Sequence, residues 1–154
     1  MALNLGEKTY LWHLVLLRVW IGAYLFYQGS RKFLRDFPHS DWITRQIGEL
    51  DKVDLYPWYK SFLRDVVVPN RELFGYLVTY GEILVGICLV LGLLTRFSSL
   101  VGLFMLINYY LGPGMARGGA SLTVQQTFIV ALLVILLSNP GRTLGLDGFL
   151  FKKK

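Results

Sequence analysis

The sequence predicts an all-α integral membrane protein: a four-helix transmembrane bundle with short amphipathic interfacial helices in its first loop. Three observations lead to this fold class. Of the 154 residues, 54% are hydrophobic and only 17% are charged, whereas soluble domains carry about 25% charged residues. The mean hydropathy is +0.47. The apolar residues gather in four blocks of roughly 15 to 22 residues, about the length that an α-helix needs to cross a bilayer. We expect a single integral membrane domain over residues 1–154.

The four predicted spans cover about residues 11–27, 73–94, 97–111 and 122–137. Aromatic residues stand at both ends of the first span, which is typical of the headgroup level of a bilayer. Thr95 and Arg96 form a tight turn between the second and third spans. Glycine and proline follow the third span and again the fourth, and both residues end helices. The apolar stretch 143–151 is too short to cross and is expected to lie at the interface.

The long first loop, about residues 28–71, is predicted to contain two short amphipathic helices. In the first helix, Ile43, Ile47 and Leu50 recur at helical spacing. The second begins at Pro57, which suits a first helical position, and has Phe62 on its apolar face. We expect both pieces to lie on the membrane surface or to cap the bundle.

The formal net charge of +6 does not indicate nucleic acid as a partner. The basic residues lie at the ends of apolar blocks and in the first loop, with no basic stripe on a soluble fold. The three lysines at 152–154 suit contact with anionic lipid headgroups. Four spans place both termini on one side. The short, basic terminal segments favour the cytoplasm, and therefore a multi-pass protein of the cell inner membrane.

Two charged residues fall inside predicted spans, Arg18 in the first and Glu82 in the second. Charges at that depth usually face a bundle interior and find partners. Gly22 and Gly86 each follow one of these charges by one turn, and small residues let two backbones approach closely. We therefore expect a buried Arg18–Glu82 ion pair. Its role is either to fix the helix register or to serve a substrate, quinone or proton site.

Uncharged polar residues form a second candidate site at one end of the bundle: Tyr27, Gln28, Asn108 and Gln125. A quinone headgroup needs hydrogen-bonding groups beside apolar walls, and these four residues suit one. The alternative is that they only form hydrogen bonds between helices. No cluster of cysteine and histidine has metal-ligand spacing, so the sequence indicates no metal or covalent cofactor. It also identifies no catalytic residue.

Three stretches of the chain resemble the DoxX/DoxD family. The first is residues 17–22 together with the glycine and lysine that follow, the second runs from Glu82 through the turn at 91–96, and the third is residues 139–147. The resemblance covers about residues 11–147. The family-like positions are Arg18, Gly22, Gly29, Lys32, Glu82, Gly86, Arg96, Arg142 and Asp147.

The long first loop is more similar to the DoxD branch, the membrane subunit of thiosulfate:quinone oxidoreductase. This resemblance implies a membrane subunit of a quinone-linked redox complex, with a quinone as its cofactor and other membrane subunits as partners. An alternative is a non-catalytic accessory subunit that stabilises a larger respiratory or photosynthetic assembly. A third and weaker reading is a small transporter that uses the Arg18–Glu82 pair.

Overall fold

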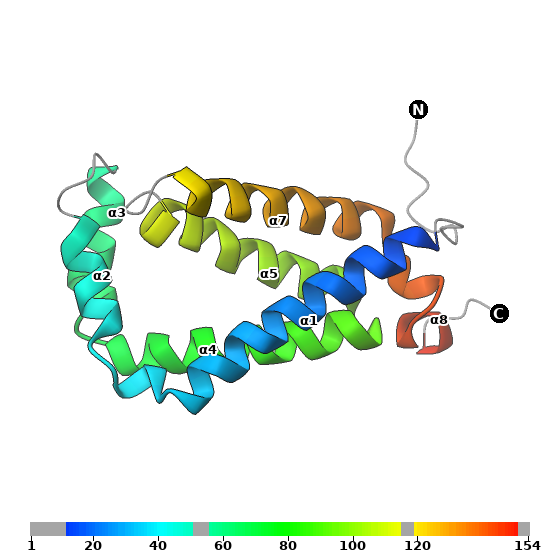
Figure 1. Cartoon of the computed structure of the whole chain (residues 1–154), viewed down its shortest axis with the longest axis horizontal. Coiled ribbons are helices and arrows are strands. Elements are labelled where there is room, and N and C mark those ends of the chain that lie inside the picture. Colours follow the sequence, from blue (N-terminus) through cyan, green and yellow to red (C-terminus); the bar gives the residue numbers. More distant parts are fainter. Residues whose placement is uncertain (1–11, 51–55, 115–118, 151–154) are drawn as a thin grey trace.

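The computed structural model describes residues 12–50, 56–114 and 119–150. This part of the chain is helical and contains no strand, which confirms the all-α prediction. Four long helices form the body: α1 (His13–Leu34), α4 (Arg71–Leu91), α5 (Thr95–Tyr109) and α7 (Gly119–Ser138). In Figure 1, α1 lies across α4, α5 lies beside α7, and α8 (Leu146–Leu150) sits at the end of the molecule where α1 begins.

Each long helix gives two buried apolar side chains to one core. These are Ile21 and Leu25 from α1, Val85 and Leu89 from α4, Leu103 and Leu106 from α5, and Leu132 and Ile135 from α7. The opposite faces remain apolar but exposed; Trp20 is 68% exposed and Phe104 70% exposed. An apolar outer surface around a packed core is the pattern expected of helices that contact lipid.

Two of the four helices are long and apolar enough to cross a membrane by themselves, namely α4 and α7. Helix α5 has only 15 residues, which corresponds to about 22 Å of rise. Helix α1 is long enough at 22 residues but includes Arg18, Arg31 and Lys32. The four-span topology therefore remains a prediction.

The first helix extends further than the sequence predicted. Its predicted span ended at Tyr27, but α1 continues for two more turns to Leu34. No glycine–proline signal interrupts it, and Gly29 is accommodated because it packs on α4. A Cβ there would lie 2.9 Å from the backbone nitrogen of Ile83. This extension places Lys32 inside the helix and moves the midpoint of α1 away from Arg18.

The first loop folds over the end of the bundle opposite the termini (Figure 1). It contains η1 (Phe37–His39), α2 (Trp42–Leu50), α3 (Pro57–Phe62) and the π-helical turn η2 (Leu63–Val67). Both predicted amphipathic helices are present. Their apolar faces combine with residues of η1 and η2 in a second buried cluster of Phe37, Ile43, Leu50, Tyr59, Leu63 and Val67. Partly buried Phe74, Val78 and Leu111 pack against it, so the first loop caps the bundle through apolar contacts.

A short segment after α7 closes the other end. Helix α7 stops at Ser138, and η4 (Pro140–Arg142) and α8 follow. Asn139 adopts the left-handed conformation at φ 47°, which turns the chain back. The backbone N–H of Asp147 donates to Gly92 O at 2.9 Å. The C-terminal segment is thus joined directly to the turn between α4 and α5.

Candidate functional site

A buried polar cluster of three side chains joins α1, α4 and α5. Lys32 Nζ donates to Glu82 Oε1 at 2.6 Å and to the Tyr109 hydroxyl at 2.9 Å. The Tyr109 hydroxyl donates to the same Oε1 at 2.7 Å. The Glu82 side chain is 3% exposed and that of Lys32 is 22% exposed. One lysine, one carboxylate and one phenol therefore form a closed triangle inside the bundle.

One oxygen of this cluster is left over. Glu82 Oε2 is buried, and it accepts no hydrogen bond from any residue that the structure describes. A buried carboxylate oxygen without a partner loses its hydration with nothing in exchange. Lys32 also has a third N–H beyond the two that it donates within the cluster. The cluster thus retains one free acceptor and one free donor.

The Arg18–Glu82 ion pair expected from the sequence is wrong. Arg18 is the sixth of the 22 residues of α1, while Glu82 is the twelfth of the 21 residues of α4. In the antiparallel packing, Arg18 reaches Val90 O at 3.5 Å. Val90 lies eight residues beyond Glu82, about 12 Å along the helix. Glu82 instead faces Gly29, and Lys32 one turn later becomes its partner.

Arg18 forms hydrogen bonds with the segment that follows α7. Its guanidinium donates to Leu144 O at 2.7 Å and to Pro140 O at 3.3 Å. The residue is only 2% exposed. Nearby, the Asp147 carboxylate accepts from the backbone N–H groups of Leu94 and Thr95. Arg18 thus joins the segment after α7 to α1, and Asp147 joins the same segment to the turn between α4 and α5. Both residues therefore have a structural role.

The four residues of the predicted polar pocket have separate partners. Gln28 Nε2 donates to the Tyr24 hydroxyl at 3.2 Å, and Asn108 Oδ1 accepts from the Tyr59 hydroxyl at 3.3 Å. Tyr27 is exposed and lies under the guanidinium of Arg31. Gln125 Oε1 is buried without a partner among the described residues. Within the described chain no hydrogen bond joins any two of the four, so a shared quinone pocket remains a prediction.

A cleft of about 490 Å³ opens beside the cluster, where α1 ends and the first loop begins. Four of its nine lining residues are basic, and one of them, Lys32, connects the cleft to Glu82. Its lining comes from α1, η1, α2 and the residues between them: Gln28, Arg31, Lys32, Arg35, Phe37, Ser40, Asp41, Trp42 and Arg45.

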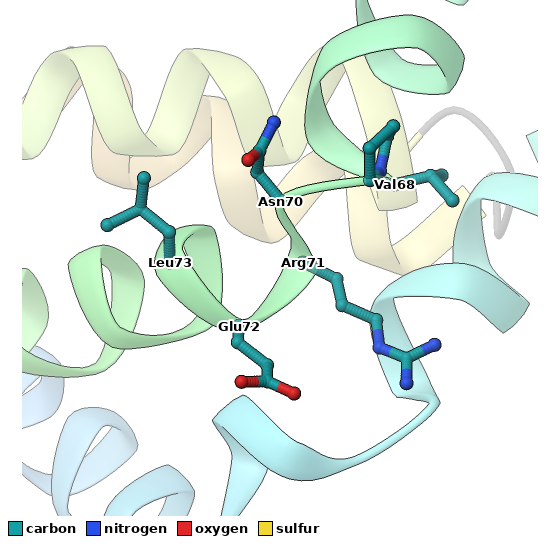
Figure 2. Close-up of a pocket in the computed structure, with 6 residues that line it drawn as sticks. Val68, Asn70, Arg71, Glu72 and Leu73 are labelled. Carbon is teal, nitrogen blue, oxygen red and sulfur yellow. The ribbon is translucent and has the colours of Figure 1, made fainter.

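A second hollow, of about 670 Å³, lies where the first loop enters α4 (Figure 2). It is formed by the single continuous segment 68–73. In Figure 2 the Arg71 side chain extends toward α2, and its Nη1 lies 3.4 Å from Asp41 Oδ1. Because its side chains diverge rather than converge, this hollow is a weaker candidate than the polar cluster.

The family-like positions fall into three structural groups. Gly22, Gly29 and Gly86 lie at the contact between α1 and α4. Lys32 and Glu82 form the polar cluster, and Arg18 and Asp147 fasten the C-terminal segment. Arg96 stands in the first turn of α5 and Arg142 in η4. Tyr109 is part of the cluster but was not identified by sequence reasoning, since a tyrosine near a helix end reads as an interfacial residue.

The chain matches the model of the DoxX family over residues 13–111. This region includes α1, the first loop, α4 and α5, and therefore all three residues of the polar cluster. No curated protein and no solved structure is significantly similar to the chain. The family model covers well over half of the sequence, and the outward apolar faces of the helices agree with a membrane location. The chain therefore belongs to the DoxX family and is a membrane protein of that family.

Proposed function

We propose that this chain is the membrane subunit of a quinone-linked redox complex, and that the Lys32–Glu82–Tyr109 cluster binds the quinone headgroup and exchanges protons with it. The observation that carries the proposal is the buried Glu82 Oε2, which has no hydrogen-bond partner among the described residues. Ionisable side chains inside a membrane protein are costly, and they commonly mark substrate or proton pathways.

The cluster suits a quinone headgroup on chemical grounds. A quinone interconverts with its quinol by taking up two electrons and two protons. Its carbonyl oxygens accept hydrogen bonds, and the free N–H of Lys32 is a donor for one of them. Glu82 Oε2 can hold a proton, while Lys32 and Tyr109 fix the other carboxylate oxygen in place. The electrons come from a partner redox protein, since the proposed role of this chain is binding and proton exchange.

The first test is quinone binding by the purified full-length protein in detergent, with decylubiquinone as the probe. Tyr109→Phe removes the hydroxyl from the cluster and is expected to weaken binding about tenfold, since a hydrogen bond to a charged group contributes about 1.5–3 kcal/mol. Tyr110→Phe is the matched control, because Tyr110 contacts Gln126 instead of the cluster. Equal binding by wild type and Tyr109→Phe would remove the proposal.

The second test measures proton exchange. Glu82→Gln keeps the shape of the side chain but cannot ionise. We expect dithionite to reduce bound decylubiquinone more slowly in this variant than in the wild type, because the headgroup loses its proton donor, and the fall in quinone absorbance measures the rate. Gln125→Leu tests the predicted pocket in parallel. If the wild-type protein binds no quinone but is isolated in fixed stoichiometry with other membrane subunits, the accessory role replaces the redox role.

A further inference from the structure

The basic cleft at the end of α1 carries more positive charge than its neighbours neutralise. Four of its lining residues are cationic, namely Arg31, Lys32, Arg35 and Arg45. Lys32 is paired with Glu82 inside the bundle. Asp41 is the acidic residue in the lining, and it is paired with Arg71 from α4.

With Lys32 and Asp41 already paired, the net positive charge of the cleft comes from its three arginines. Arg31 contacts the Tyr27 ring, which leaves its charge uncompensated. The structure shows no ion pair for Arg35 or Arg45 with any residue it describes. Guanidinium groups present several N–H donors in a planar fork that matches phosphate oxygens. Their convergence on one cleft favours an anionic ligand with a phosphate group.

The surroundings of the cleft are those of a membrane surface. It begins where α1 ends at Leu34, next to Phe33, which is 56% exposed, and Leu34, which is 82% exposed. Within the cleft, the rings of Phe37 and Trp42 contact each other at a tilt of 56°, with 5.3 Å between their centroids. Large apolar side chains next to a basic cleft suit an amphiphile whose acyl chains lie along the helix end and whose headgroup enters the cleft.

We propose that this cleft binds the phosphate headgroup of an anionic phospholipid, with Arg35 and Arg45 as its principal ligands and Arg31 as a third. The proposal is separate from the quinone hypothesis, because the proposed headgroup ligands are the three arginines, whereas Lys32, which also lines the cleft, is paired with Glu82. Free inorganic phosphate shares the headgroup's chemistry. The exposed Phe33 and Leu34 favour the lipid, because a free ion gains nothing from apolar neighbours.

The test is native mass spectrometry of the full-length protein in detergent, with dihexanoyl phosphatidylglycerol, dihexanoyl phosphatidylcholine and inorganic phosphate as probes. We expect the wild type to bind phosphatidylglycerol at least tenfold more tightly than phosphatidylcholine. Each basic residue near an anionic surface contributes about fivefold. Arg35→Gln/Arg45→Gln is therefore expected to weaken phosphatidylglycerol binding about 25-fold and to abolish the preference.

Two further variants test whether the double glutamine variant loses binding because of the cleft itself. One keeps the two charges, and the other removes two charges elsewhere in the first loop. Arg35→Lys/Arg45→Lys keeps both charges but not the planar fork, so its preference for phosphatidylglycerol should lie between those of the wild type and the double glutamine variant. Lys60→Gln/Arg64→Gln removes the same charge from the first loop outside the cleft and should bind like wild type. The proposal is overturned by equal affinity for the two lipids, by unchanged phosphatidylglycerol binding in the double glutamine variant, or by inorganic phosphate that binds as tightly as phosphatidylglycerol and displaces it.

Discussion

The backbones of Gly22 and Gly86 touch where α1 packs against α4. A Cβ on Gly86 would lie 2.8 Å from the carbonyl oxygen of Gly22, and a Cβ on Gly22 would lie 2.9 Å from that of Gly86. These distances are too short for any side chain, so both positions require glycine. This contact sets the register of the two helices, and through it the position of Lys32 opposite Glu82.

Replacing Gly86 with alanine is expected to destabilise the protein. The new Cβ would lie 2.5 Å from the backbone nitrogen of Phe26, and forced overpacking costs about 1–3 kcal/mol. Gly81→Ala is the matched control on the same helix, since its Cβ meets only the flexible Met105 side chain, at 3.4 Å. Thermal unfolding in detergent should show a clearly lower midpoint for Gly86→Ala than for Gly81→Ala. Equal midpoints would contradict the close contact.

Breaking the Lys32–Glu82 pair on one side is expected to be severe. Lys32→Met leaves a buried carboxylate uncompensated, and such losses run to about 3–5 kcal/mol. The lower end is expected here because Lys32 is partly exposed. Lys32→Met/Glu82→Leu should recover much of the loss.

A double-mutant cycle then distinguishes the two candidate partners of Glu82. The Lys32 and Glu82 changes should couple strongly, whereas Arg18→Met and Glu82→Leu should add within about 0.5 kcal/mol, as distant sites do. Strong coupling between Arg18 and Glu82 would contradict the observed register.

The spacing of residues in the sequence places Lys32 on the buried face of α1. The prediction missed this because it ended the first helix too early, at Tyr27. Arg18, Gly22, Leu25, Gly29 and Lys32 follow one another at intervals of four and three residues, and so form one stripe along α1. All but Lys32 are fully buried. A span that ends at Tyr27 contains Arg18 but leaves Lys32 beyond its end. The close approach of glycines was predicted correctly; the pairing was not, because it depends on the register of two whole helices.

Other parts of the site depend on contacts that no local pattern contains. The two amphipathic helices of the first loop were predictable from their spacing. That Tyr59 of the second one reaches Asn108 on α5 was not, because the contact joins residues 49 positions apart. Tyr109 likewise joins the cluster only because α5 ends beside Glu82. Local periodicity predicts elements, while side-chain partners follow from how those elements pack.

Asp147 is expected to stabilise the start of α5. Its carboxylate accepts from Leu94 N at 2.6 Å and from Thr95 N at 2.8 Å, and Leu94 adopts the left-handed conformation at φ 47°. Asp147→Ala would leave these N–H groups without their acceptor, a loss of about 1–3 kcal/mol. Asp147→Asn retains one carbonyl acceptor and should lose less. Thermal unfolding should rank wild type above Asn and Asn above Ala; an Ala variant as stable as wild type would contradict this capping role.

His39 is expected to make the stability of the first loop depend on pH. The hydrogen bond from its Nδ1 to the Asp36 carboxylate, at 2.5 Å, raises the pKa of His39 above its usual value, and the negative charge of Asp36 adds to the effect. Because the pKa of His39 is higher in the folded than in the unfolded state, the His39–Asp36 pair adds to the free energy of unfolding. This contribution is fully present below the pKa of an unfolded histidine, about 6.5. It is lost as the pH rises through the higher folded value.

The measurement is the difference in unfolding midpoint between wild type and His39→Asn. This difference should be larger at pH 5.5 than at pH 8.5, and small at both, because the pair is exposed. Asp36→Asn is the control, since it removes the carboxylate and should remove most of the pH dependence of the difference, with a smaller contribution left from Glu72. A difference that grows with increasing pH would contradict the assigned sign.

Labelling of single cysteines in intact cells tests the four-span topology. Cys88 is first replaced by alanine, and cysteines are then introduced at Trp12, Glu49 and Leu144, which are all exposed. If α1, α4, α5 and α7 all cross, positions 12 and 144 should react from one side and position 49 from the other. If only α4 and α7 cross, the two helices that are long and apolar enough by themselves, position 49 should react from the same side as position 12. The side on which position 49 reacts therefore decides whether α1 spans the membrane, and with it whether the Lys32–Glu82–Tyr109 cluster lies inside a complete bundle.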